Sequence, residues 1–149
     1  MSIDTAGDCE TYPNCFTLTL VPMAKDDDTA WVYEISEQRN DGAVLNYALR
    51  SGYFKRMFGF NNVNFDGPVI HTFLELADTG MNGREMARVL WMKANDIIHG
   101  ADRWAHRVKP WREILKQVDL YLIHHFDNPD KATSLKKLEF AMRSRSIRD

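Results

Sequence analysis

The sequence has few cysteines, no long apolar run and no secretory signal. Cys9 and Cys15 are its only cysteines among 149 residues, too few for a zinc site built on four cysteines. No apolar run approaches the roughly 18 residues that span a bilayer. Asp4 also stands where a signal peptide carries basic residues. We therefore expect a cytoplasmic protein with reduced thiols.

Motifs of the common enzyme classes are also missing. The chain contains no Gly-x-Ser-x-Gly elbow, no glycine-rich phosphate loop and no GxGxxG tract. No electropositive feature near Cys15 in the sequence would activate its thiol. These absences predict a protein that is not an enzyme and that uses no cofactor.

Length and composition indicate one globular domain. A chain of 149 residues with 44% hydrophobic and 27% charged residues is large enough to bury one core. The net charge of −2 conceals an asymmetry, because residues 1–83 hold 12 acids and 5 bases while residues 84–149 hold 9 acids and 14 bases. The basic half is predicted to meet either an anionic partner or the acidic half.

Apolar periodicity predicts a single α+β domain, mainly α, over residues 1–149. Residues 1–14 are expected to form a flexible lead-in, and 15–36 a β-hairpin whose strands, 16–21 and 30–36, alternate in polarity. The remaining part, 43–146, is expected to hold about six helices. Their expected ranges are 43–58, 68–80, 82–92, 94–108, 110–126 and 131–146.

The tract from 72 to 99 carries the strongest functional pattern. A helix is expected to end at Gly80, and Asn82 with Glu85 forms a capping-box pattern that starts the next one. This order resembles the helix-turn-helix of LuxR/GerE-type regulators. The matching positions are Leu74, Leu76, Gly80, Met81, Glu85, Met86, Ala87, Leu90, Met92 and Ile97.

This resemblance implies a small DNA-binding transcriptional regulator, a homodimer, with its helix-turn-helix at about 68–107. The recognition helix would run from Ala94 to Arg107 and enter the major groove of double-stranded DNA. Side chains implied to lie near the DNA are Lys93, Asn95, His99 and Arg103, with Arg84 and Arg88 on the backbone.

Two other interpretations remain open. The first is a non-enzymatic modulator or inhibitor that binds another protein through an acidic surface or an aromatic one. The aromatic residues concerned are Trp31, Tyr33, Tyr47, Tyr53, Phe54, Phe58 and Phe60. The second is a metal-dependent enzyme whose ligands come from two neighbouring helices. Those ligands would be His99, Asp102 and His106 on one helix, and His124, His125 and Asp127 on the other.

Overall fold

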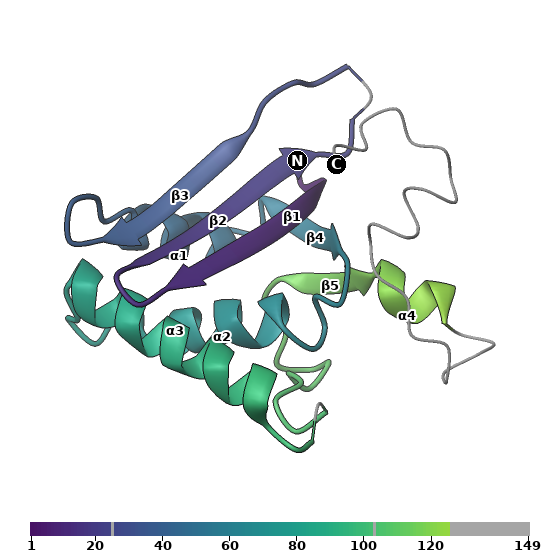
Figure 1. The fold of residues 1–149 in the computed structure, drawn as a ribbon. Coiled ribbons are helices and arrows are strands. Elements are labelled where there is room, and N and C mark those ends of the chain that lie inside the picture. The colour runs from purple at the N-terminus through teal and green to yellow at the C-terminus, as the bar shows by residue number, and fades with distance from the viewer. Residues whose placement is uncertain (25, 103, 126–149) are drawn as a thin grey trace, which may run out of the picture.

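The computed structural model describes residues 1–24, 26–102 and 104–125. Within these residues the chain forms five strands and four helices (Figure 1). The elements are β1 (Ile3–Tyr12), β2 (Cys15–Pro22), β3 (Trp31–Ser36), α1 (Gly42–Arg50), β4 (Phe54–Gly59), α2 (Asp66–Leu76), α3 (Gly83–His99), β5 (Lys116–Asp119) and α4 (Leu120–His124). No helix in this part of the chain is both long and apolar enough to cross a membrane.

The strands form one mixed sheet in the order β3-β2-β1-β4-β5. β1 pairs with β2 in antiparallel register along most of its length, from Thr5–Pro22 to Tyr12–Cys15. On its other edge β1 pairs with β4 in parallel, but only as far as Ala6 opposite Phe58. Beyond Ala6, the edge of β1 that faces β4 is therefore not paired with that strand.

The helices bury one face of the sheet. α3 packs on β1, β2 and β3, and α2 packs on α3 (Figure 1). The inward residues of β2 alternate with polar ones, so Phe16, Leu18 and Leu20 are fully buried. They share one core cluster with Leu45 and Leu49 of α1, Phe73 of α2 and Leu90 of α3.

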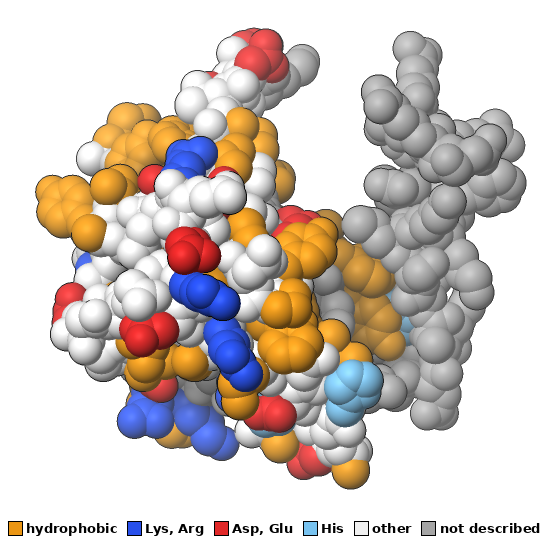
Figure 2. Space-filling view, turned by 60° about the vertical axis from the view of Figure 1, so that its left-hand side comes forward, with side chains coloured by type: hydrophobic (Ala, Val, Ile, Leu, Met, Phe, Trp, Pro, Cys, Tyr) orange, Lys and Arg blue, Asp and Glu red, His pale blue; other side chains and the backbone are white. Residues whose placement is uncertain are grey.

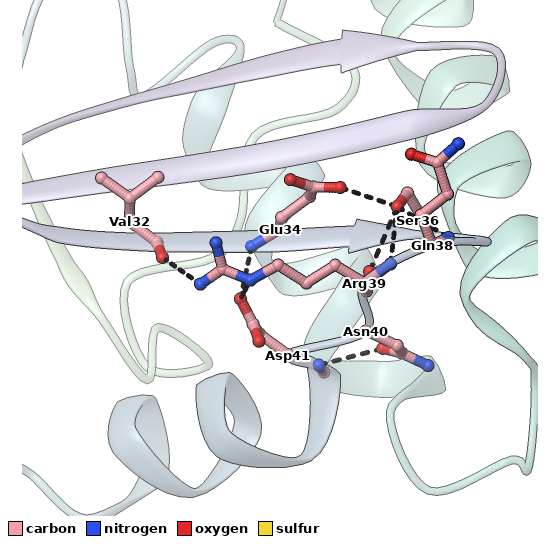
Figure 3. Close-up of polar contacts among 8 residues, drawn as sticks. Val32, Glu34, Ser36, Gln38, Arg39, Asn40 and Asp41 are labelled. Atoms are coloured by element: carbon pink, nitrogen blue, oxygen red, sulfur yellow. Dashed lines mark hydrogen bonds and ion pairs between the residues drawn. The ribbon is translucent and has the colours of Figure 1, made fainter.

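A network of polar contacts holds the turn between β3 and α1 (Figure 3). Asp41 Oδ2 accepts the backbone N–H of Glu34 at 2.9 Å and pairs with Arg39 Nε at 2.8 Å. Arg39 also donates to the carbonyl of Val32 at 3.2 Å, and its own N–H donates to Ser36 Oγ at 3.0 Å. These contacts set the direction in which α1 leaves the sheet.

The predicted mainly α fold is wrong, because a five-stranded mixed sheet and few helices stand in its place. The antiparallel pairing of 16–21 with 30–36 is confirmed. However, the expected lead-in at 1–14 contains β1, the middle strand of the sheet. The expected helix 43–58 ends at Arg50, since Gly52 adopts φ +75° and the chain turns into β4.

The second half of the chain also contains fewer helices than predicted. The helix expected at 68–80 is α2, and the expected helices 82–92 and 94–108 are replaced by one continuous helix, α3, which ends at His99. The capping box at Asn82 and Glu85 is confirmed at its start. The expected helix 110–126 is replaced by a turn, the short strand β5 and the short helix α4. The expected helix 131–146 lies outside the described residues.

Candidate functional site

β1 carries acidic side chains on the face of the sheet away from the core. Because side chains alternate along a strand, Thr5 and Cys9 point into the core, whereas Asp8 and Glu10 point to the opposite face. Thr5 and Cys9 are buried, and both acids are exposed. Two carboxylates on one face of the central strand are therefore available to a ligand.

Asp66 brings a third carboxylate to the same strand. It is the first residue of α2 and is only 4% exposed. Its Oδ1 accepts the backbone N–H of Cys9 at 2.9 Å. That contact lies beyond the last β1–β4 pair, so the Asp66 side chain occupies the edge of β1 that β4 leaves open. This hydrogen bond fixes the Asp66 carboxylate next to Cys9, the residue that lies between Asp8 and Glu10 on β1.

The surroundings of Asp66 disfavour a negative charge on its carboxylate. Burial raises the pKa of Asp66 to about 6, and the charge of Asp8 raises it as well, while the hydrogen bonds from Cys9 oppose both effects. The pKa of Asp8 is raised as well, because neighbouring atoms partly desolvate its carboxylate although the residue is exposed. Neither Asp8 nor Asp66 forms an ion pair within 4 Å among the described residues. A cation bound at these two carboxylates would be stabilised, because neither has a cationic partner in an ion pair.

A groove of about 470 Å³ opens beside Asp8 on the same face of the sheet. Its walls are mainly apolar, with Phe58 and Phe60 on one side and Val21 on another. The complete lining is Ala6, Gly7, Asp8, Thr19, Val21, Phe58, Gly59, Phe60 and Leu120. The aromatic walls suit a ligand with a flat ring, and the carboxylate of Asp8 suits a cation bound next to that ring.

Asp119, at the end of β5, holds the loop that leads from β4 to Asp66. Its carboxylate accepts the backbone N–H groups of Asn61 at 2.8 Å, Val63 at 3.1 Å and Tyr121 at 2.9 Å. Asn61 adopts φ +62°, a left-handed conformation that such a turn requires. Phe60 meets the ring of Tyr121 edge to face, with 5.4 Å between centroids. β5 and α4 thus brace one wall of the groove.

The residues predicted to contact DNA do not lie on a separate recognition helix. Arg84, Arg88, Lys93, Asn95 and His99 are all part of α3, while Arg103 lies outside the described residues. The turn expected before Ala94 is absent from α3, because the stretch 91–93 has no helix-breaking residue and the buried positions 86, 90, 94 and 97 continue at helical spacing.

Several of these side chains are engaged within the protein. The Asn95 amide donates to the carbonyl of Trp91 at 2.8 Å, and Lys93 Nζ lies 3.0 Å from His106 Nδ1. Arg84 lies 3.8 Å from Glu37. On the face drawn in Figure 2, basic side chains lie among acidic and hydrophobic ones and form no continuous basic surface. Three of the six side chains predicted to contact DNA are thus engaged in contacts within the protein.

The predicted histidine metal site is not formed in the described part of the chain, where no three His, Cys, Asp or Glu side chains gather to hold a metal ion. His106 is engaged by Lys93 instead. His125 stacks on Tyr121 with 4.1 Å between ring centroids, and its Nδ1 lies 2.7 Å from the Tyr121 carbonyl. His99 is exposed at the end of α3. Asp127 is outside the described residues.

The sequence interpretation did not include Asp8, Glu10 or Asp66 among the site residues. The available signal was the spacing of Asp8 and Glu10, which places both on one face of any strand that contains them. Comparison of the sequence with protein-family models, curated proteins and solved structures found no match. The geometry around β1 therefore carries the functional interpretation.

Proposed function

We propose that the protein is a Mg²⁺-dependent phosphodiesterase that cleaves nucleic acid at the Asp8–Asp66 site. One observation carries this proposal: a buried carboxylate, Asp66, is held on β1 next to Asp8, which lines an apolar groove, and neither acid forms an ion pair within 4 Å among the described residues. Mg²⁺ is commonly bound by one or two carboxylates together with phosphate oxygens of the substrate. The lack of three converging protein ligands in the described residues is compatible with that mode of binding.

The chain's own groups have distinct roles in this proposal. Asp8 and Asp66 supply carboxylate oxygens, and the Cys9 N–H orients Asp66. Glu10 lies two residues beyond Asp8 on the same face, roughly 7 Å along the strand, where it positions the attacking water and accepts its proton. Mg²⁺ held by Asp8 and Asp66 would neutralise charge on the phosphate and polarise it toward attack. The water oxygen bonds to phosphorus as the ester P–O bond breaks, and the leaving oxygen takes up a proton from solvent.

The groove gives the substrate class. Phe58 and Phe60 present aromatic surface next to Asp8, and Leu120 adds an aliphatic contact. Every nucleobase has a flat face that stacks on such surfaces, so this mode of binding needs no particular base sequence. A base in the groove would bring its phosphate toward the carboxylates.

This proposal replaces two expectations from the sequence, namely that the protein is not an enzyme and that it uses no cofactor. The other expectations stay predictions. Nucleic acid remains the proposed partner, with its contact moved from α3 to the sheet, and the homodimer and the cytoplasmic location are retained. The two free cysteines, Cys9 and Cys15, support a reducing compartment. Of the aromatic residues in the protein-binding alternative, Tyr47 and Tyr53 are exposed, at 77% and 42%, whereas Tyr33 and Phe54 are buried.

The test is cleavage of end-labelled single-stranded and double-stranded DNA by the full chain in MgCl₂. We expect Asp8→Asn and Asp66→Asn each to slow cleavage roughly 10²–10³-fold, a loss typical of removing one group that stabilises charge in the transition state. Asp96→Asn is the matched control, because Asp96 is an exposed carboxylate on α3. Absence of cleavage by the wild type with Mg²⁺ or Mn²⁺ would rule out the proposal. Equal activity of the wild type and Asp66→Asn would do the same.

A further inference from the structure

A second cavity, of about 240 Å³, lies between α2, α3 and the segment 106–112. It contains neither Asp8 nor Asp66, and its lining includes four cationic side chains and one carboxylate. The cations are Lys93, Arg107, Lys109 and Arg112, and the carboxylate is Glu75. This excess of positive charge in one small cavity sets it apart from the mainly apolar groove beside Asp8.

Two histidines complete the cavity, and their hydrogen bonds assign their protonation. His71 Nδ1 donates to the carbonyl of Gly67 at 2.8 Å, while its Nε2 accepts the N–H of Ile114 at 2.9 Å, so the ring is neutral. Burial lowers the pKa of His71 in agreement with this. An ammonium group only donates, so the Lys93 contact makes His106 Nδ1 an acceptor. The positive charge therefore resides on the lysines and arginines.

Arg107 is held rigidly at this cavity. Its Nε donates to Asn64 Oδ1 at 2.6 Å, and its guanidinium carbon lies 3.6 Å from the ring centroid of Trp104. Its Nη2 is buried and has no hydrogen-bond partner in the described part of the chain. An arginine fixed by a hydrogen bond and by stacking loses little side-chain freedom when its guanidinium binds an anion in the cavity.

None of the four cations forms an ion pair within 4 Å with a carboxylate of the described residues. Lys109 and Arg112 are exposed at the mouth, while Lys93 and Arg107 are partly buried. Pockets for drug-sized molecules start at roughly 300 Å³, so a cavity of this size suits a compact ligand. The concentration of cations in it selects for negative charge.

We infer that this cavity binds a phosphate group, through Lys93 and Arg107 inside and Lys109 and Arg112 at the mouth. The group belongs either to free phosphate or pyrophosphate or to the backbone of a nucleic acid. Glu75 disfavours ligands that extend over its carboxylate, which favours a compact anion. The cavity lining includes none of Asp8, Glu10 and Asp66, so the two sites share no residue.

The test is calorimetric titration of the full chain with inorganic pyrophosphate in EDTA, so that no metal contributes at Asp8 and Asp66. We expect Lys93→Gln and Arg112→Gln each to weaken binding at least about tenfold, the loss typical of one charge-assisted contact. Arg88→Gln is the matched control, since Arg88 is an exposed arginine on α3 outside the cavity. Arg112→Gln is the safer variant for folding, because Arg112 is exposed.

A second titration, with a short single-stranded oligonucleotide, separates the two sources of phosphate. Pyrophosphate binding that is lost in the cavity variants supports a free anion as the ligand. Binding of the oligonucleotide alone, lost in the same variants, supports a nucleic-acid backbone. Absence of binding to either, or equal weakening by Arg88→Gln, would overturn the inference. Asp66→Asn is expected to bind as the wild type does, so failure of the proposed cleavage activity leaves this test intact.

Discussion

Two carboxylates, Asp66 and Asp119, are each only 4% exposed, but their surroundings differ. Asp119 accepts three backbone N–H groups from the β4–α2 loop and α4. Asp66 accepts the N–H of Cys9 and has a second carboxylate, Asp8, as its neighbour. Burial alone therefore does not identify a functional acid. A carboxylate surrounded by donors organises the chain, whereas the carboxylate beside a like charge is the one that we propose binds a cation.

The largest effect that separates the two is on stability. We expect Asp119→Ala to lower the free energy of unfolding by about 4 kcal/mol, because three N–H groups lose their acceptor. Asp66→Asn keeps an acceptor for Cys9 and removes a charge that burial disfavours. Its free energy of unfolding at pH 7 should be equal to or higher than that of the wild type. Denaturant unfolding of the full chain measures both, and equal losses in the two variants would remove the distinction.

The next effect is on the pH dependence of stability. The pKa of Asp66 is raised from 3.8 to about 6 in the folded protein. Between these values the folded state keeps a proton that the unfolded state has released, so stability falls as the pH rises. The fall amounts to about 3 kcal/mol and is complete above the folded pKa. Unfolding curves from pH 3.5 to 7.5 should show this fall in the wild type. The same fall in Asp66→Asn would show that another group causes it.

The smallest effect is stabilisation by the metal ion. At ten times its dissociation constant, Mg²⁺ should raise the free energy of unfolding of the wild type by about 1.4 kcal/mol at pH 7. Asp8→Asn and Asp66→Asn should lose this gain, whereas Asp96→Asn should keep it. The measurement is the unfolding midpoint with and without MgCl₂ at constant ionic strength. A gain that persists in Asp66→Asn would place the ion elsewhere.

Local patterns predicted the local parts of the fold. The alternation of Phe16, Leu18 and Leu20 found β2, and its pairing with β3 followed from the next alternating run. The Asn82–Glu85 capping box was found because both of its hydrogen bonds join residues three apart. β1 was missed because its inward residues include Thr5 and Gly7, which are small or polar and do not display the period of two.

The errors in the helical part have a common cause. The apolar residues at 45, 49, 53 and 57 follow helical spacing, but Gly52 ends the helix and Phe54 and Met57 belong to β4. Asp66 was predicted as a helix start, which is correct, but not as a neighbour of Asp8. That proximity depends on the parallel pairing of β1 with β4, about 50 positions apart in the chain. No local pattern contains such a contact.

The position of β1 has a consequence for how the protein folds. β2 follows β1 after a two-residue connection, so this hairpin closes on a timescale of about 1–10 μs. β4 is reached only after β3 and α1, and pairing across so long a loop is slower. Until then one edge of the middle strand is open to pairing with another chain. Refolding should therefore lose yield to aggregation as protein concentration rises, and the proposed cleavage activity should return only in the slow phase.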